Sequence, residues 1–408
     1  MTPQSDIDET LPAFPAPRSA ACPFAPSPEL RALAERGPVT RVRSWGGSTP
    51  WAVTGHAEQK ELLSDPRLSV DFAAPNFPSP IDPAHSHGGG GDLSFVGMDD
   101  PEHARLRRMV SGTFTIKRVE AMRPMVQRIT DDFIDRMLEG PKPADLVQAL
   151  ALPLPSMVIS EMLGVPYDDH EFFQANSKLL VSATAGAAER GAAHAALSGY
   201  LDDLVTQKTA KPADDLVSKL AARVRTGELT AREAANMGVL LLLGGHETTA
   251  NMISLGTLAL LQHPEQLAAV RETDDPRVVV DAVEELLRYL TIVHLGRRRT
   301  ALEDIEVAGH TIPAGDGVIL LGELANRDPG VFADPDRLDI TRNARRHQAF
   351  GGGTHHCVGQ PLARMELQVL YPTLLRRVPT LRAAIPLEDV KFKYDAVIYG
   401  LHELPVTW

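Results

Sequence analysis

The residues with the clearest chemical potential stand between Phe350 and Gly359, where three consecutive glycines and two histidines precede Cys357. Consecutive glycines allow positive φ angles, which let the backbone approach a flat ligand closely. The residues after Gly359 have helical periodicity. Cys357 is therefore expected directly before a helix N-terminus, where free amides and the helix dipole favour a thiolate. A thiolate ligand pushes electron density onto a haem iron and favours cleavage of the O–O bond.

His355, His356 and Cys357 would also suit a zinc ion, because zinc binds imidazole and thiolate ligands. A structural zinc site normally takes two ligand pairs at finger or ribbon spacing, and the sequence has no second pair of this kind. Zinc therefore stays the weaker alternative. The other cysteine, Cys22, stands in a proline-rich stretch without ligand-like neighbours, and we expect it to be unreactive and free of a disulfide.

A second unusual cluster interrupts a long apolar helix. Thr230 and Glu233 form a capping box, and the helical pattern then runs to Gln262. Its middle, Gly244 to Thr248, holds two glycines and an acid where the helix should be most buried, although each glycine costs ~1 kcal/mol relative to alanine. Such a conflict between local preference and fold is typical of a functional site. A close contact between helices with an exposed glutamate is the alternative interpretation.

The rest of the sequence predicts a mainly α protein with a smaller β portion. Amphipathic helical patterns occur near residues 101–111, 117–139, 153–163 and 186–209. Short strand signals flank Gly46-Gly47 like a hairpin and recur after residue 298. We predict a single domain over residues 1–408, with its β-rich portion at about 38–70 and 299–325 and its helical core at about 100–290 and 359–378.

Charge and hydropathy exclude several classes of protein. The chain has 41 basic and 53 acidic residues, and a net charge of −12 disfavours general binding to nucleic acid. The N-terminal residues MTPQSDIDET lack the basic start and apolar run of a secretory signal. The most apolar stretch, residues 237–245, falls far short of the ~20 residues that cross a bilayer. We expect a cytoplasmic monomer without a membrane anchor.

Four motifs resemble those of the cytochrome P450 monooxygenases and occur in the same order along the chain. The resemblance is to the bacterial class I type, in particular the actinomycete branch that oxidises natural products and drugs. Phe350 to Gly359 matches the haem loop F-G-x-G-x-H-x-C-x-G. Gly244 to Thr248 matches the oxygen-activating A/G-G-x-D/E-T. Glu285 to Arg288 matches E-x-x-R, and Arg342 would complete its ion triad.

The resemblance implies the cytochrome P450 fold, in which a long central helix lies over the haem and a haem-thiolate loop precedes a C-terminal helix. It implies that Cys357 is the axial ligand of the iron of haem b, iron protoporphyrin IX. The residues that it assigns to the cofactor, including the propionate partners, are His103, Arg107, Arg299, Phe350, His355, Cys357 and Gly359.

The same resemblance assigns oxygen activation to the glycine-rich turn of the long helix. Gly244 and Gly245 would open a groove for O₂ and water. Thr248 would orient the bound oxygen, and Glu247 would relay protons from solvent. A peroxide-driven haem-thiolate peroxygenase and a non-catalytic haem sensor stay as alternatives, and the acid–alcohol pair argues against both.

The family likeness further implies a bulky apolar substrate, such as a macrolide, another polyketide, a terpenoid or a drug-like molecule. The expected substrate-facing residues are Leu240, Leu243, Val293, His294 and Ile398. The loop at 71–96 would form the entrance, and its His85 and His87 lack a third metal ligand, so we expect them to be solvated.

Electrons are expected from a ferredoxin and its NAD(P)H ferredoxin reductase, since the sequence has no flavin or iron–sulfur motif. Such ferredoxins are acidic, so a net charge of −12 demands a local basic patch for docking. The sequence predicts that this patch comprises Arg105, Arg108, Arg345, Arg346 and Arg364.

Overall fold

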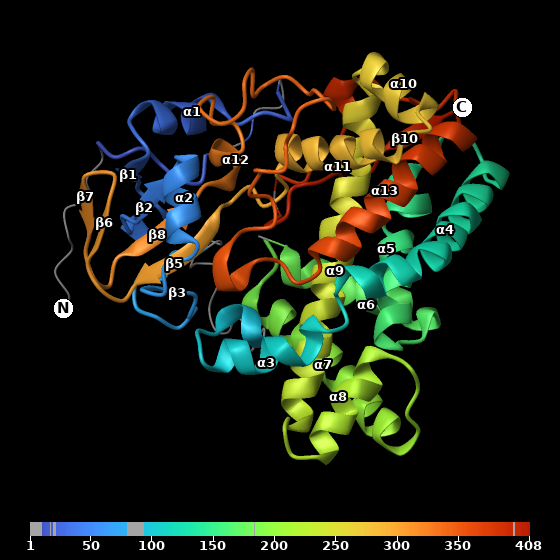
Figure 1. The fold of residues 1–408 in the computed structure, drawn as a ribbon, viewed down its shortest axis with the longest axis horizontal. Coiled ribbons are helices and arrows are strands. Elements are labelled where there is room, and N and C mark those ends of the chain that lie inside the picture. The colour runs from blue at the N-terminus through green and yellow to red at the C-terminus, as the bar shows by residue number, and fades with distance from the viewer. Residues whose placement is uncertain (1–9, 17, 19–21, 80–93, 183, 395) are drawn as a thin grey trace.

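The structure is a computed structural model, and it describes residues 10–408 except 17, 19–21, 80–93, 183 and 395. The α-helices are α1 Pro28–Glu35, α2 His56–Leu62, α3 Glu102–Ser111, α4 Ile116–Glu139, α5 Pro153–Leu163, α6 His170–Val181, α7 Ala187–Ala210, α8 Leu216–Arg225, α9 Ala231–Leu261, α10 Pro264–Glu272, α11 Pro276–Leu290, α12 Gly322–Ala325 and α13 Gln360–Arg377. The strands are β1 Val39–Arg41, β2 Trp51–Val53, β3 Leu68–Ser69, β4 Ala144–Asp145, β5 Arg297–Ala301, β6 Ile305–Val307, β7 His310–Ile312, β8 Gly317–Leu320, β9 Arg382–Ala383 and β10 Pro405–Thr407. Figure 1 shows the main β portion on one side and the helices on the other.

The long helix α9 runs through the helical portion (Figure 1). Its capping box is confirmed, because the Thr230 hydroxyl accepts from the Glu233 amide and the Glu233 carboxylate accepts from the Thr230 amide at 2.7 Å. At ~1.5 Å per residue, its 31 residues span roughly 46 Å. Helices α5, α7 and α13 pack against it, and most of its side chains are buried. The prediction of a helix through the core is therefore confirmed.

The larger sheet has the strand order β1-β2-β8-β5-β3. Strands β1 and β2 pair antiparallel, which confirms the predicted N-terminal hairpin, and β8 adds to β2 in parallel. Leu62 and Leu63 at the end of α2 cover one face, whereas Leu30 and Leu33 of α1 cover the other. This packing holds β5 with its three arginines at fixed positions beside the helical portion.

A second sheet, in the order β4-β10-β9, joins segments that are far apart in the chain. Its strand β10 corresponds to the predicted C-terminal strand. The sequence did not predict β4 or β9, because two residues are too short to show a periodicity. The mainly α architecture with a smaller β portion is confirmed, whereas the single-domain assignment stays a prediction.

The predicted ion triad is present between α11 and the segment that leads to Cys357. Glu285 lies 2.7 Å from Arg288 and 3.3 Å from Arg342, and the side chains of Glu285 and Arg288 are 0% exposed. Arg288 also donates to the carbonyls of Asn326 and Pro335 at 2.9 and 2.8 Å. These contacts fix the course of residues 326–342 before the cysteine loop begins.

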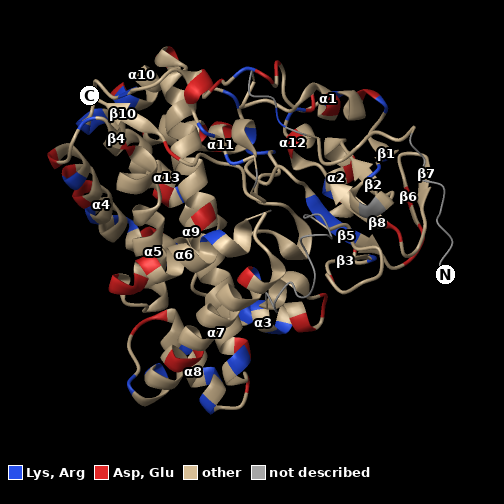
Figure 2. Ribbon diagram, turned by 180° about the vertical axis from the view of Figure 1, so that it is seen from behind, with Lys and Arg blue, Asp and Glu red and all other residues tan. Residues whose placement is uncertain are grey.

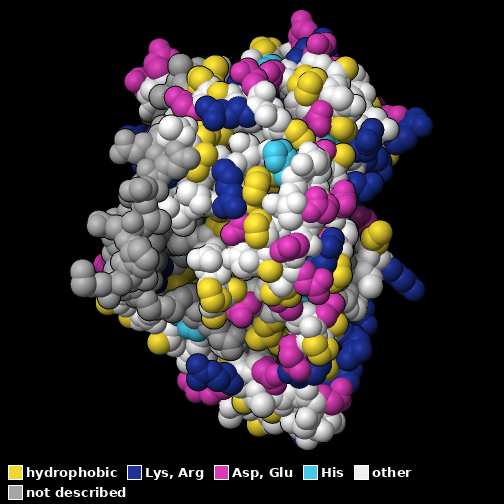
Figure 3. Space-filling model, turned by 90° about the vertical axis from the view of Figure 1, so that its left-hand side faces the viewer, with side chains coloured by type: hydrophobic (Ala, Val, Ile, Leu, Met, Phe, Trp, Pro, Cys, Tyr) yellow, Lys and Arg dark blue, Asp and Glu magenta, His cyan; other side chains and the backbone are white. Residues whose placement is uncertain are grey.

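The surface carries charges of both signs. On the face shown in Figure 3, acidic and basic side chains are interspersed. Within the described part of the chain, no helix combines the length and the apolar character needed to span a membrane.

Candidate functional site

The cysteine loop has the sharp backbone that its glycines allow. Gly351 and Gly353 have φ angles of 74° and 62°, and a Cβ at Gly353 would overlap the Leu63 carbonyl. The Cys357 amide donates to the Phe350 carbonyl at 3.0 Å, which closes the loop on itself. Helix α13 begins at Gln360 with Gly359 as its N-cap, so the predicted place of Cys357 before a helix is confirmed.

Cys357 is solvent-accessible, yet it is surrounded by many protein atoms. Burial raises the pKa of the Cys357 thiol, whereas a hydrogen bond from the Gly359 amide and the charges of Arg107 and Arg297 lower it. Without a metal charge, burial has the larger effect, so the amides by themselves do not produce the predicted thiolate. A bound cation would favour the thiolate form strongly.

Three consecutive arginines of β5 lie beside this loop, and Figure 2 shows a blue basic stretch in this strand. Arg297 donates to the Ala349 carbonyl at 2.6 Å and Arg299 to the Arg298 carbonyl at 2.7 Å. Burial lowers the pKa of both Arg297 and Arg299 to about 10. Among the described residues, neither guanidinium forms an ion pair, although the charge of Asp99 attracts Arg299 from a longer distance.

Helix α3 brings His103 and Arg107 to the same place, as their spacing predicts. The rings of His103 and His355 lie 4.1 Å apart, and Arg107 donates to the His356 carbonyl. His103 Nδ1 bonds Asp100 at 3.0 Å, whereas its buried Nε2 has no hydrogen-bond partner in the described part of the structure. Burial and the neighbouring His103 and Arg299 lower the pKa of His355 to about 4.

Helix α9 has a distinct accessible stripe. Leu240, Leu243 and Thr248 are only partly buried and Gly244 is exposed, although most residues around them in the helix are buried. A Cβ at Gly244 would meet no atom within 4 Å, whereas one at Gly245 would lie 2.9 Å from Ile159 of α5. Gly244 therefore faces open space, and Gly245 permits close packing of α5 on α9.

The acid–alcohol pair stands at this stripe. The Thr248 hydroxyl donates to the Gly244 carbonyl at 2.6 Å, which leaves its lone pairs free to accept. Glu247 is 5% exposed, so the alternative of an exposed glutamate is wrong. Its carboxylate lies 3.7 Å from the ammonium of Lys393, a residue that sequence reasoning missed because no motif links residues so far apart.

The predicted substrate residues differ in their surroundings. Leu240, Leu243, Val293 and Ile398 are partly accessible. His294 is buried, and its ring bonds the Ala396 carbonyl at 2.8 Å, so it ties its loop to the C-terminal segment. Their contacts with a substrate stay predictions. Residues 80–93 of the predicted entrance, including His85 and His87, lie outside the described residues.

The predicted basic patch requires a correction. Arg108 and Arg346 are exposed as expected, and the exposed Arg345 lies 3.5 Å from Asp281. Arg105, however, pairs with Glu102 and Glu233, and Arg364 pairs with Glu284 at 2.5 Å. Because paired charges attract a partner weakly, these two residues contribute little to a positive surface.

Arg364 instead belongs to a cluster beneath the cysteine loop that the sequence did not reveal. Its guanidinium lies 4.4 Å from the centre of the Phe350 ring, and Glu284 also accepts from His347 at 3.0 Å. Burial raises the pKa of Glu284, but hydrogen bonds from His347 and Arg364 outweigh it and bring it down to about 2. The cluster joins α11, α13 and the loop.

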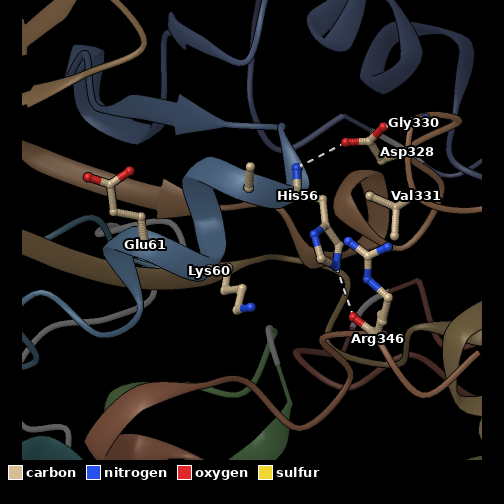
Figure 4. A pocket seen from close by; sticks show the side chains of 8 residues that line it. His56, Lys60, Glu61, Asp328, Gly330, Val331 and Arg346 are labelled. Carbon is tan, nitrogen blue, oxygen red and sulfur yellow. Dashed lines mark hydrogen bonds between the residues drawn. The ribbon is translucent and has the colours of Figure 1, made fainter.

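A separate surface hollow of about 590 Å³ lies beside α2 (Figure 4). The His56 amide donates to Asp328 at 3.2 Å, and the His56 ring bonds the Arg346 carbonyl at 2.9 Å. These contacts tie α2 to the chain that leads into the cysteine loop. His56 at the rim of this hollow therefore has structural hydrogen-bond partners.

The residues of this site fit a haem. A haem carries two propionates, which would neutralise the unpaired guanidiniums and accept a hydrogen bond from His103 Nε2. Its iron would take the Cys357 sulfur, and the open space at Gly244 would lie on the oxygen side. Among the described residues, no cluster of His, Cys, Asp and Glu is arranged to hold another metal ion.

Comparisons with known proteins agree with this fit. The family model described as Cytochrome P450 matches residues 42–383. The chain is 53% identical over 405 residues to the cytochrome P450 GfsF of Streptomyces halstedii, which covers 99% of this chain and 98% of that protein. It is 48% identical over 399 residues to the vitamin D3 dihydroxylase of Streptomyces griseolus, covering 97% of each.

Solved structures give the same result. The mycinamicin VIII C21 methyl hydroxylase MycCI from Micromonospora griseorubida, with mycinamicin VIII bound, superposes with a TM-score of 0.91 at 40% identity, covering 97% of this chain and 100% of that one. The fold and site thus define a haem-dependent monooxygenase of bacterial type. The chain belongs to the cytochrome P450 family, and the predicted family, fold and enzyme class are confirmed.

Proposed function

We propose that Cys357 binds the iron of haem b and that the enzyme inserts one oxygen atom from O₂ into a bulky apolar small molecule. The haem iron, when bound, activates O₂ with electrons from a redox partner. The observation that carries the proposal is the convergence of Cys357, His103 and the unpaired β5 arginines at one interior site.

The residues around the cofactor have separate roles in this proposal. His103, Arg107, Arg299 and His355 hold the two propionates, and Phe350 and Gly359 shape the loop around the sulfur. Gly244 and Gly245 keep space on the oxygen side of α9. Thr248 accepts a hydrogen bond at its Oγ1, and Glu247 passes protons from water to that hydroxyl.

The partly accessible Leu240, Leu243, Val293 and Ile398 support an apolar substrate. The names of two relatives point the same way, since one is a vitamin D3 dihydroxylase and another was solved with mycinamicin VIII bound. A macrolide, another polyketide or a terpenoid is the proposed substrate class.

A ferredoxin with an NAD(P)H ferredoxin reductase is the proposed electron source, and the protein is proposed to act as a cytoplasmic monomer. The exposed Arg108 and Arg346 support a docking surface for an acidic ferredoxin. Reversing Arg108 and Arg346 to glutamate together should slow reduction and weaken its dependence on salt. Reduction that is indifferent to both changes would exclude this surface.

The function is tested by reconstitution under ¹⁸O₂. A panel of macrolides and terpenoids is first screened for compounds that change the spin state of the haem iron. A compound that produces one is then incubated with ferredoxin, reductase and NADPH. We expect product with one ¹⁸O atom. Product that forms with hydrogen peroxide but not with NADPH would support the peroxygenase alternative instead, and a haem protein without any product would support the sensor.

A further inference from the structure

The charged group facing Glu247 comes from a distant part of the chain. Lys393 Nζ lies 3.7 Å from Glu247 Oε2, and the side chains of the two residues are 16% and 7% exposed. This separation exceeds a hydrogen bond, so the attraction is electrostatic and the carboxylate keeps lone pairs for water. Because the pair is screened from solvent, the attraction is stronger than that of a surface pair.

The backbone holds Lys393 firmly in this position. The Lys393 amide donates to the Gly400 carbonyl at 2.8 Å, and the His402 amide donates to the Lys391 carbonyl at 2.8 Å. Phe392 and Leu401 form an antiparallel bridge between them. The two arms of this C-terminal segment therefore present Lys393 and Gly400 side by side.

Both of these residues contact Asn251, which lies one turn after Glu247 on α9. Lys393 Nζ donates to Asn251 Oδ1 at 3.1 Å, and Asn251 Nδ2 donates to the Glu247 carbonyl at 2.8 Å. A Cβ at Gly400 would overlap the Asn251 side chain, so glycine is needed for this approach. Asn251 thus fixes the ammonium relative to the backbone of Glu247.

His246, next to Glu247 on α9, is a further titratable side chain that interacts with Glu247 and Lys393. Burial lowers the pKa of His246, an effect that Glu247 opposes and Lys393 reinforces. The imidazole is therefore neutral at neutral pH. Lys393 supplies the positive charge that a buried carboxylate requires.

We propose that Lys393 is a positioning residue that keeps Glu247 ionised and oriented, so that the acid can take a proton from water and pass it to Thr248. In each transfer Glu247 gains one proton from solvent and gives one to the Thr248 hydroxyl, which releases its own proton to the reacting oxygen, while Lys393 keeps its charge. The inference rests on the proposed relay role of Glu247 and Thr248, and it assigns a function to a residue outside the motifs.

The first test reads the charge of Glu247 directly. Lys393→Gln keeps a donor for Asn251 and removes the charge. In infrared spectra of the haem-loaded protein at neutral pH, the Lys393→Gln variant should show a protonated carboxyl band. The double variant Lys393→Gln/Glu247→Gln should lack this band. Wild type, Lys393→Arg and Lys391→Met should lack the band. Lys391 is a matched control because it lies on the same segment and pairs with the exposed Glu403 at 2.8 Å. If Lys393→Gln does not bind haem, Lys393→Met replaces it.

The second test reads proton delivery. With the first macrolide that shifts the spin state, Lys393→Gln should form product about tenfold more slowly, with a larger solvent isotope effect, and Lys393→Arg should restore the rate to within about twofold. Absence of the carboxyl band in Lys393→Gln, or in Lys393→Met where that variant replaces it, would overturn the inference and leave the proposed function intact. A band without slower product formation would overturn the role of Lys393 in proton delivery. Unchanged turnover in Glu247→Gln would show that the proposed relay itself fails.

Discussion

The two walls of the interior site are built in opposite ways. On the cysteine wall, the loop is held by contacts from four directions: the Phe350 carbonyl, β5, α3 and the Arg364 side chain. On the α9 wall, a Cβ at Gly244 would meet no atom within 4 Å, and the Thr248 hydroxyl donates to the carbonyl of Gly244 in the same helix. The cysteine wall is rigid, whereas the α9 wall has room and polar groups free to act.

This contrast suggests a division of labour. A thiolate ligand must keep one geometry through every turnover, so dense packing and ion pairs around it are useful. A wall that admits O₂, water and a proton needs space and side chains with unused hydrogen-bonding capacity. Substitutions on the cysteine wall are therefore expected to have the largest effects, and those on the α9 wall smaller ones.

The largest effect is expected from Arg288→Ala. The change leaves Glu285 buried beside Arg342 only, and breaking a buried pair in this way costs ~3–5 kcal/mol. We expect little soluble haem-loaded protein, measured as haem content per chain. Arg277→Ala is the matched control, because Arg277 lies on the same helix with its side chain 86% exposed. Equal haem content in both variants would contradict a role of the triad in holding the cysteine wall.

A smaller effect on the same wall is expected from Glu284→Gln. The pKa of Glu284 is lowered from 4.5 to about 2, so its ionised form stabilises the fold above pH 4.5 and this contribution is lost as the pH falls toward 2. The loss should amount to about 3 kcal/mol in wild type and be missing in the variant. Urea unfolding across this pH range measures the difference. If the free energy of unfolding changes equally with pH in wild type and in Glu284→Gln, Glu284 does not carry this charge.

On the open wall, Thr248→Ala should alter the fate of oxygen more than stability. Without the hydroxyl we expect about tenfold less product per NADPH, equivalent to ~1.4 kcal/mol, with hydrogen peroxide in its place. Thr248→Ser keeps the hydroxyl and should stay close to wild type. Product and peroxide are measured against NADPH consumed. The role fails if Thr248→Ala couples as well as Thr248→Ser.

The smallest effect is expected from a pair of neighbouring substitutions. Gly244→Ala gains up to ~1 kcal/mol of helix preference, because the new methyl group meets open space. Gly245→Ala should destabilise instead, since its Cβ would lie 2.9 Å from Ile159. Thermal unfolding compares the two. The same sign for both would contradict the asymmetry of the two glycines.

Sequence reasoning predicted what is encoded locally. The capping box of α9, the helix after Gly359 and the spacing of His103 and Arg107 each depend on residues within a turn or two. It missed Lys393 and the Glu284–Arg364 pair, because those contacts join segments separated by 146 and 80 positions. It also counted Arg105 and Arg364 as free charges, since a pattern shows charge but not the partner that neutralises it.

The most direct test of the central claim is the absorption spectrum of the dithionite-reduced protein under carbon monoxide. We predict a strongly red-shifted Soret band in wild type and its loss in Cys357→Ser, because a cysteine thiolate would be the axial ligand. A band at the ordinary histidine-haem position in freshly folded wild type, or no haem at all, would show that Cys357 is not the ligand and would contradict the account built on it.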